Sequence, residues 1–240
     1  MATHVSRETQ PPISALKLDF SAQLGALHAA ATELGLPLNT AQAHRLLAYR
    51  DMIAKWNKVY NLTSLRDPMQ MLSHHIIDSL AAAPPLQKYL QLAGQGTWRL
   101  LDVGSGGGLP GVVLATVIDG LDVTCVDTVG KKAAFVQQAA NELTLKNLRG
   151  VHARVEAMQA TSFDVITSRA FASLADFVQL TRMHLKPATQ SSGVWMALKG
   201  KRPDDEIAAL PAEVEVFHVE QLHVPGLNAE RCIVWMRLRA

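Results

Sequence analysis

The chain has 240 residues, 48% of them hydrophobic, which suits one large α/β domain or such a domain with an extension. Its formal net charge is only +2, from 23 basic and 21 acidic side chains, so total charge does not mark it as a nucleic-acid-binding protein. No apolar stretch approaches the ~18 residues of a membrane span, no apolar core of a signal peptide opens the chain, and two distant cysteines argue against a disulfide or zinc framework.

The N-terminal part of the chain is expected to be a helical extension that precedes the main domain. Residues 1–12 are polar and are expected to be disordered. Beyond them, apolar side chains recur at the spacing of amphipathic helices. We expect helices at residues 13–34, 40–56 and about 69–82, the last of them stopped by Pro84 and Pro85. The predicted division is an extension over residues 13–97 and a second domain over residues 98–240.

From residue 98 onward, strand-like apolar runs alternate with helical patterns. Strands are expected at residues 99–103, 122–127, 148–153, 163–168 and 193–198, and the clearest helices between them at residues 131–143 and 174–185. After a short helix near residues 204–210, two more strands are expected at residues 213–222 and 231–238. Their short connection makes them an antiparallel hairpin, because parallel neighbours need a long crossover. The sequence therefore predicts an α/β fold with a mostly parallel sheet that ends in an antiparallel hairpin.

A cluster of glycines follows the first of these strands and ends where a helix begins. Gly104, Gly106 and Gly108 can adopt positive φ and let a ligand approach the backbone. Pro110 suits the first turn of the helix, because no hydrogen bond needs its missing N–H there. Glycine-rich turns also join strands to helices where no ligand binds. The loop therefore predicts a nucleotide-type ligand only together with its acidic neighbours.

Two aspartates beside this loop indicate which ligand it binds. Asp127 ends the second strand roughly twenty residues beyond the first glycine, where dinucleotide folds carry an acid that accepts hydrogen bonds from ribose hydroxyls. Asp102 directly precedes the glycines, where it would repel a pyrophosphate but attract the ammonium and sulfonium of S-adenosylmethionine. We therefore favour S-adenosylmethionine over a nicotinamide or flavin cofactor. With this cofactor, the predicted fold is that of a Rossmann-like class I S-adenosylmethionine-dependent methyltransferase.

Two further candidate site residues follow later strands. Glu156 lies after the third strand, beside the adenine in Rossmann-like methyltransferases; an exposed glutamate at the start of a helix is the alternative. Arg169 closes the fourth strand, where ligands of open α/β sheets bind, and a guanidinium suits a phosphate, a carboxylate or an electron-rich base. No Asn/Asp-Pro-Pro-aromatic motif follows this strand, and Cys125 and Cys232 lie within strands. These features argue against methylation of an exocyclic amine and against a covalent cytosine-C5 mechanism.

Basic residues form three groups along the chain. Lys131 and Lys132 follow the second strand, and Lys199, Lys201 and Arg202 follow the fifth, where the rim of an active site is expected. The third group lies in and after the second helix: Arg45, Arg50, Lys55, Lys58 and Arg66. For this third group, a solvated helix face is as good an interpretation as a binding surface.

A histidine pair in the expected third helix raises the question of a metal site. Adjacent histidines on a helix point about 100° apart, so His74 shares a face with Asp78 while His75 does not. We favour a structural role, with His74 bonded to Asp78 or to a nearby loop. No bound metal is expected.

Five ordered segments resemble the motifs of one family. They read WNKVYNLT at residues 56–63, HIIDSL at 75–80, DVGSGGGLPG at 102–111, SRAFA at 168–172 and LKGK at 198–201. Over about residues 40–238 the chain resembles the bacterial small-subunit rRNA guanine-N7 methyltransferase G family, also called RsmG or GidB. Gly107 departs from the family pattern, in which relatives carry proline.

The resemblance implies methyl transfer from S-adenosyl-L-methionine to N7 of one guanine in 16S rRNA, in the cytoplasm. The partner would be 16S rRNA, the 30S subunit or its assembly intermediate. The alternatives are a small-molecule methyltransferase and a non-catalytic S-adenosylmethionine-binding partner of the ribosome.

The resemblance also assigns roles to residues of this chain. It implies cofactor contacts at Gly104, Leu109, Val155, Glu156 and Arg169, with Arg169 as the catalytic residue near the base or the methyl donor. The loop and ribose arguments above add Asp102, Gly106, Gly108 and Asp127 to the expected cofactor site. The residues expected to hold rRNA phosphates are Lys131, Lys199, Lys201 and Arg202.

Overall fold

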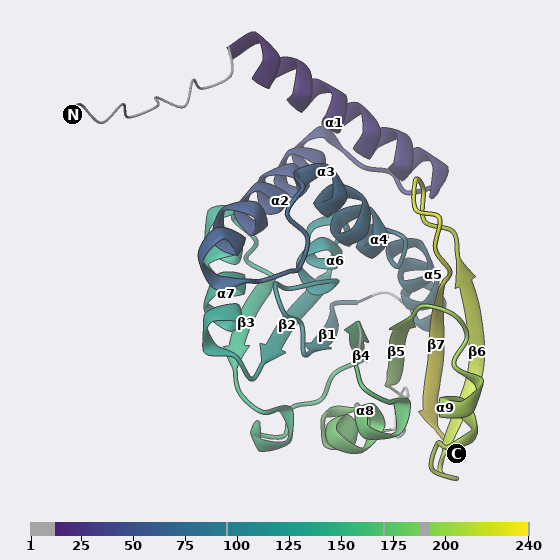
Figure 1. Ribbon diagram of the computed structural model, residues 1–240. Helices are drawn as coiled ribbons and strands as arrows, with labels where there is room; N and C mark the ends of the chain where they lie inside the picture. Colours follow the sequence, from purple (N-terminus) through teal and green to yellow (C-terminus); the bar gives the residue numbers. More distant parts are fainter. Residues whose placement is uncertain (1–12, 95, 170, 188–192, 240) are drawn as a thin grey trace, which may run out of the picture.

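The N-terminal part of the protein is helical, and the rest alternates strands with helices (Figure 1). The computed structural model describes residues 13–94, 96–169, 171–187 and 193–239, so the expected disorder of residues 1–12 lies outside the described residues. The N-terminal elements are α1 (Ile13–Glu33), α2 (Thr40–Tyr60), α3 (Pro68–Met71), the π-helix η1 (Leu72–Ile77), α4 (Asp78–Leu80) and α5 (Ala83–Ala93).

Within the described residues, seven strands form one sheet in the order β3-β2-β1-β4-β5-β7-β6. They are β1 (Trp98–Val103), β2 (Leu121–Asp127), β3 (Leu148–His152), β4 (Val165–Arg169), β5 (Val194–Lys199), β6 (Val214–Leu222) and β7 (Arg231–Leu238). β1 to β5 are parallel, whereas β7 is antiparallel to both β5 and β6. The predicted mostly parallel sheet with a final hairpin is confirmed. Because chain order reverses at β1, the crevice for a ligand is expected where β1 and β4 end.

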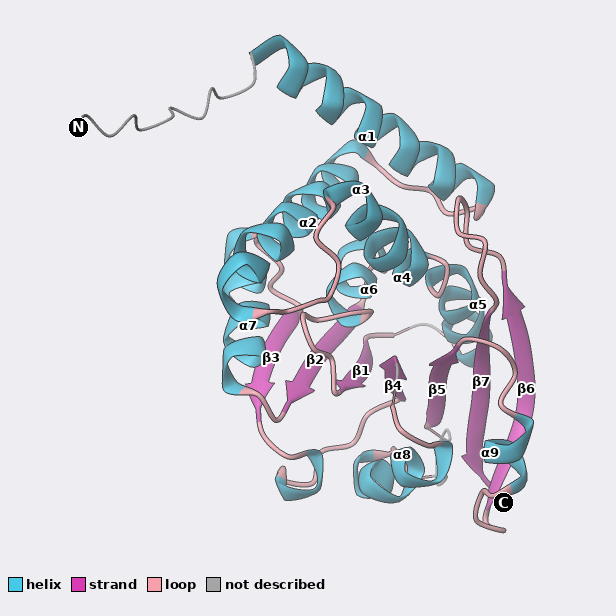
Figure 2. Ribbon diagram, in the orientation of Figure 1, coloured by secondary structure: helices cyan, strands magenta, loops and turns pink. Residues whose placement is uncertain are grey.

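Helices cover both faces of the sheet (Figure 2). The remaining helices are α6 (Gly111–Val117), α7 (Gly130–Glu142), the 3₁₀ helix η2 (Val155–Ala157), α8 (Leu174–Thr181), the 3₁₀ helix η3 (Arg182–His184) and α9 (Asp204–Ala208). Successive side chains of a strand point to opposite faces: Leu100 belongs to the core shared with α2, α5, α6 and α7, and Leu101 to the core shared with α8. Among the described helices, none has the length and apolarity needed to cross a membrane.

The single helix expected at residues 69–82 is wrong in two respects. The segment is divided into α3, η1 and α4, with the π-helix in its middle. Pro84 and Pro85 do not merely follow it but lie in the first turn of α5, a helix that was not predicted. Proline fits a first helical turn because no intrahelical hydrogen bond needs its N–H there. Pro110, by contrast, is the N-cap of α6, one position earlier than expected.

Candidate active site

The glycine loop between β1 and α6 combines open positions with tightly packed ones. Gly104 and Gly106 have φ of +65° and +60°, and an added Cβ would meet open space at both. At Gly108 an added Cβ would lie 2.5 Å from a methyl group of Val112. The first two glycines therefore leave room for a ligand against the backbone, while Gly108 permits α6 to pack closely.

Asp127 lies at the carboxyl end of β2, directly beneath this loop. Its Oδ2 accepts a hydrogen bond from the Gly106 N–H at 2.9 Å, and its Oδ1 accepts one from the Val129 N–H at 2.8 Å. Each carboxylate oxygen keeps a further lone pair for another donor. The aspartate thus shapes the loop and stands at the place expected of a ribose acceptor; the ribose contact itself stays a prediction.

Asp102 occupies a different environment from the one that the sequence suggested. Its side chain is fully buried, and Oδ2 accepts a hydrogen bond from the Gly111 N–H at 2.8 Å, at the start of α6. Burial raises the pKa of Asp102 from 3.8 to about 7. The carboxyl therefore anchors α6 below the loop instead of facing an open cavity. The Asp102 carboxyl could attract a cationic ligand only through the backbone of the loop that lies above it.

The N-terminal helices supply one wall of a cavity at the glycine loop, where the sequence predicts the cofactor; we name it the cofactor cavity. A cavity of about 180 Å³ is lined by the glycine loop, Leu109 and Arg169 together with Ile53, Leu62, Thr63 and His75. From α2, the buried Tyr49 hydroxyl donates a hydrogen bond to the Gly107 carbonyl at 2.5 Å. Burial raises the pKa of Tyr49, so the hydroxyl keeps the proton that it donates. The helical extension is thus a structural part of the site.

Asn57 holds the loop that carries Leu62 and Thr63 to this cavity. Its Nδ2 donates to the Leu65 carbonyl at 2.8 Å, and its Oδ1 accepts from the Thr63 N–H at 2.9 Å. Arg66 adds a hydrogen bond to the Asn57 carbonyl at 3.1 Å. Three hydrogen bonds at Asn57 thus hold this loop in the absence of a ligand.

Arg169 lies at the end of β4 and shares a carboxylate with a second arginine. Its Nη1 is 3.1 Å from Asp78 Oδ2, while Arg231 Nε, at the start of β7, is 2.7 Å from Asp78 Oδ1. Asp78 is 95% buried, so both guanidinium groups are oriented by a carboxylate shielded from water. The expected bond between His74 and Asp78 is not formed, because His74 Nδ1 lies near Ser73 Oγ and the Gln70 carbonyl.

A second cavity adjoins the first on the side of β5 and β7. It measures about 430 Å³, and its lining includes His75 and Arg169, which also line the cofactor cavity. Phe171, Lys199 and Arg231 contribute to its other walls. We name it the substrate cleft. The shared residues place it beside the cofactor cavity.

His75 stands at the boundary between the two cavities. Its Nε2 lies 2.8 Å from the hydroxyl of Thr63. Burial and the neighbouring Arg169 guanidinium lower the pKa of His75 from 6.5 to about 4. The imidazole is therefore neutral near pH 7 and is a weak base there.

Val155 and Glu156 lie in η2, after β3, as expected of residues beside an adenine. Val155 is buried, and its carbonyl is 2.8 Å from Nε2 of the buried His184. Glu156 is exposed and lies 3.7 Å from Arg154. The adenine contact of both residues stays a prediction.

The four lysines and arginines expected to hold phosphates differ in their surroundings. Lys199 is only 12% exposed and is paired with Glu206 at 2.7 Å, so it belongs to the substrate cleft and not to the outer surface. Arg202 pairs with Asp204, whereas Lys131 and Lys201 are exposed. RNA contact stays a prediction for all four.

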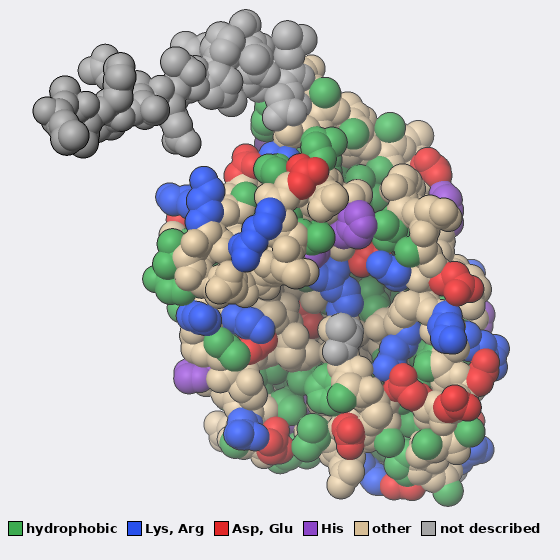
Figure 3. Space-filling model, in the orientation of Figure 1, with side chains coloured by type: hydrophobic (Ala, Val, Ile, Leu, Met, Phe, Trp, Pro, Cys, Tyr) green, Lys and Arg blue, Asp and Glu red, His purple; other side chains and the backbone are tan. Residues whose placement is uncertain are grey.

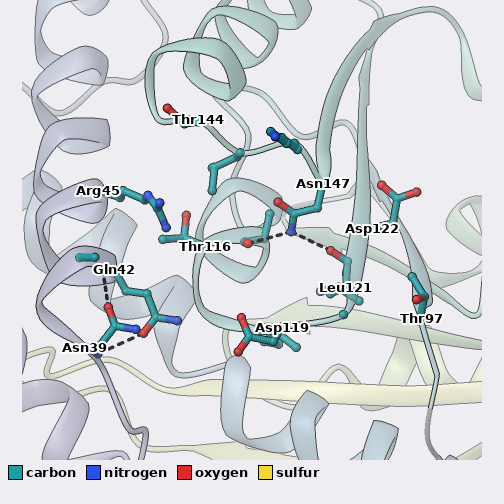
Figure 4. A pocket seen from close by; sticks show the side chains of 16 residues that line it. Asn39, Gln42, Arg45, Thr97, Thr116, Asp119, Leu121, Asp122, Thr144 and Asn147 are labelled. Atoms are coloured by element: carbon teal, nitrogen blue, oxygen red, sulfur yellow. Dashed lines mark hydrogen bonds between the residues drawn. The ribbon is translucent and has the colours of Figure 1, made fainter.

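A polar hollow at the opposite end of the sheet is unrelated to the glycine loop (Figure 4). It measures about 630 Å³ and lies against the amino ends of β1 and β2. Asn147 Nδ2 donates there to the carbonyls of Ala115 and Leu121, at 2.9 and 2.8 Å. The Asn147 side chain of this hollow therefore has a structural role, because it connects its own loop to α6 and β2. In the described part of the chain, no three His, Cys, Asp or Glu side chains are grouped as metal ligands.

Several site residues escaped the sequence interpretation. Thr63, His75 and Asp78 lie within family-like segments, yet local spacing assigned them no function. No sequence pattern pointed to Arg231, because its partner Asp78 is 153 residues away in the chain. Tyr49 reads as an ordinary helix residue. These positions are brought to the site only by the packing of the extension and the hairpin on the sheet.

Known proteins resemble this chain in sequence over most of its length. The family model described as GidB, rRNA small subunit methyltransferase G, matches residues 42–234. A relative from Acidovorax ebreus (strain TPSY), named Ribosomal RNA small subunit methyltransferase G, is 60% identical over 217 residues, 88% of this chain and 94% of the relative. One of the same name from Polaromonas sp. (strain JS666 / ATCC BAA-500) is 60% identical over 215 residues, 89% of this chain and 93% of the relative.

Among solved structures, TrmN from Thermus thermophilus has a similar fold. Its TM-score is 0.51 at 20% sequence identity, covering 70% of this chain and 53% of that chain. At this identity the likeness concerns the fold alone.

Proposed function

Since the chain belongs to the GidB family of rRNA small subunit methyltransferases G, we propose that it methylates N7 of a guanine in 16S rRNA. Its cofactor is S-adenosyl-L-methionine, as the family implies. The names of the relatives support rRNA of the small subunit as the substrate. We accordingly expect the protein in the cytoplasm, acting on 16S rRNA, the 30S subunit or an assembly intermediate.

The residues of the glycine-loop cavity fit S-adenosyl-L-methionine. Gly104 and Gly106 leave open space beside the backbone, and Asp127 has lone pairs for ribose hydroxyls. When bound, the cofactor supplies a methyl group attached to a positively charged sulfur. Gly108 and Leu109 continue the loop toward α6, and we assign Val155 and Glu156 to the adenine end. Ile53 and Leu62 line the cavity with apolar side chains that displace water.

The observation that carries the N7 assignment is how the ionisable side chains of the substrate cleft are engaged: His74 Nδ1 lies near Ser73 Oγ and the Gln70 carbonyl, and Lys199 is paired with Glu206. His75 is neutral with a pKa of about 4, and Asp78 is engaged by two arginines. Burial raises the pKa of Cys232, so this thiol is not an activated nucleophile. Guanine N7 carries a free lone pair and needs no proton removed before it attacks. Positioning of the reacting groups is then sufficient for attack by this atom.

Arg169 is the residue to which we assign the catalytic role. Its guanidinium, oriented by Asp78, lines both the cofactor cavity and the substrate cleft. Together, Arg169, Arg231 and Asp78 carry one net positive charge. This excess favours a phosphate or the electron-rich edge of a base in the cleft. Positioning of reacting groups can lower a barrier by ~7–11 kcal/mol.

Transfer of tritium from labelled S-adenosyl-L-methionine tests the proposal. The purified chain is incubated with naked 16S rRNA and with 30S subunits from cells that lack the modification, and the labelled base is mapped. We expect label on N7 of one guanine. Label on another atom would overturn the N7 assignment, and label on small metabolites alone would favour a small-molecule methyltransferase. Cofactor binding without any transfer would favour a non-catalytic ribosome partner.

A further inference from the structure

Unpaired cations gather on the surface beside the cofactor cavity. On the face shown in Figure 3, Lys and Arg side chains lie over α2 and α7. The last part of α2, the loop after it and the first turn of α7 carry five: Lys55, Lys58, Arg66, Lys131 and Lys132. Among the described residues, no carboxylate lies within 4 Å of these five. Their positive charge is therefore uncompensated by the protein.

An exposed aromatic ring lies among these cations. Tyr60, the last residue of α2, is 39% exposed, and its ring centroid lies 5.0 Å from that of Trp56. Trp56 in turn contacts Phe135 of α7 at 5.2 Å. Phe135 lies one helical turn beyond Lys131 and Lys132. The packing of α2 on α7 thus brings the ring and the lysines of both helices to one surface.

This surface adjoins the cofactor cavity along the chain. Leu62 and Thr63, which line that cavity, follow Tyr60 by two and three residues. Asn57 and Arg66 hold the intervening loop through hydrogen bonds to its backbone and to Asn61. Tyr60 and Arg66 therefore flank a hydrogen-bonded loop that lines the cofactor cavity.

We propose that Lys58, Tyr60, Arg66, Lys131 and Lys132 form a platform that binds single-stranded RNA next to the target guanine. A base stacks on Tyr60, and the cations contact the neighbouring phosphates. Proteins that hold single-stranded RNA combine exposed aromatic rings with a positively charged surface in this way. The platform rests on the proposed function, and it extends the substrate contact from the guanine to the strand that carries it.

Removal of the ring is the first test. Tyr60→Ala is compared with Phe217→Ala, because Phe217 is 38% exposed and also packs against a tryptophan, on the distant strand β6. Loss of a stacked base weakens binding roughly 5- to 150-fold. We expect this loss for Tyr60→Ala with naked 16S rRNA by filter binding, near-wild-type binding for Tyr60→Phe and Phe217→Ala, and unchanged cofactor affinity throughout. Equal effects of the two alanine variants would overturn the platform.

Neutralisation of the lysines is the second test. Each phosphate contact contributes about 0.7 to the slope of log affinity against log salt for single strands. Lys131→Gln combined with Lys132→Gln should therefore lower that slope by about 1.4. The matched control is Arg45→Gln with Lys146→Gln, a half-buried and an exposed cation at the hollow of Figure 4, neither of which forms an ion pair with a described carboxylate.

The outcomes separate the platform from the proposed function. Wild-type methylation of 16S rRNA with equal salt slopes for both double variants would refute the platform and leave the function standing. A platform needed for neither naked 16S rRNA nor 30S subunits would refute it, whatever the wild-type methylation. Failure of the wild-type chain to methylate any 16S rRNA would refute the function itself.

Discussion

Three buried aspartates beneath the site have different partners and different consequences. Asp78 is shared by Arg169 and Arg231, whereas Asp102 and Asp127 accept hydrogen bonds from backbone N–H groups. At Asp78 two guanidinium groups share one carboxylate, which leaves an excess of one formal positive charge in the cleft. A buried carboxyl without an ion pair, such as that of Asp102, resists ionisation. The local partner, more than the residue type, decides what each aspartate does.

Replacement of Asp127 should weaken cofactor binding. Asp127→Ala removes the proposed acceptors of the ribose hydroxyls and the bond to the Gly106 N–H. Loss of charged hydrogen bonds worth ~1.5–3 kcal/mol would raise the dissociation constant roughly 10- to 150-fold. Calorimetric titration with S-adenosyl-L-methionine measures this change. Asp119→Ala, an exposed aspartate at the other end of the sheet, is the control, and equal affinity of both variants would remove Asp127 from the site.

Asp102 should make the protein less stable as pH rises toward neutrality. Its pKa is about 7 in the folded protein and about 3.9 in an unfolded chain. Between these values the folded state binds more protons, so the free energy of unfolding falls as pH increases, then levels off above pH 7. The full effect is on the order of 4 kcal/mol. Asp102→Asn removes it while keeping an oxygen that can accept from the Gly111 N–H.

Urea unfolding at several pH values from 4.5 to 8 measures the free energy of unfolding of wild type and Asp102→Asn, and the difference between them gives the contribution of the Asp102 carboxyl. The difference is needed because the lowered pKa of His75 acts in the opposite direction below pH 6.5, where the unfolded state takes up the proton. We expect Asp102→Asn to gain stability relative to wild type as pH rises. If the free energies of unfolding of the two proteins changed equally with pH, the Asp102 carboxyl would have the same pKa in the folded and unfolded states.

At the scale of elements, the loop after α2 is held rigid so that it can form a cavity wall. Asn57→Ala removes the bonds to the Leu65 carbonyl and the Thr63 N–H. Buried polar groups left without partners should lower the free energy of unfolding by ~1–3 kcal/mol. A loosened wall should also weaken cofactor binding about tenfold, which equals about 1.4 kcal/mol. Hydrogen exchange of residues 61–66 and calorimetry measure the two effects.

Asn147→Ala is a matched control for this prediction. Asn147 also joins two backbone carbonyls through its side chain, but at the far end of the sheet (Figure 4). It should lower stability to a similar extent and leave cofactor affinity unchanged. If Asn57→Ala also left that affinity unchanged, the loop would have only a structural role.

Elements with a strong local pattern were predicted from sequence, and those set by distant packing were not. The apolar run at residues 99–103 and the glycines after it predicted β1 and its loop to within one residue. α5 was missed because Pro84 and Pro85 suggest a helix end as readily as a helix start. The pairing of Arg231 with Asp78 follows from the packing of β7 on β5, which no local spacing reveals.

At the scale of the whole molecule, the extension and the sheet share one hydrophobic core. Leu46 of α2, Leu86 of α5, Val112 of α6 and Trp235 of β7 belong to the same buried cluster. The site is assembled across this core, since Tyr49 holds the glycine loop from one side. The helices before residue 98 therefore share a core with the sheet and contact the glycine loop directly.

The rate of the chemical step tests the N7 assignment on the complete protein with rRNA. If N7 attacks with a free lone pair, the single-turnover rate at saturating cofactor and rRNA should be nearly flat from about pH 6 to 9. His75 stays neutral throughout this range, since its pKa is about 4. Asp102 titrates near pH 7 in the protein without cofactor, so Asp102→Asn is measured in parallel. A limb of unit slope present in both proteins would reveal an essential general base and favour attack by an exocyclic amine.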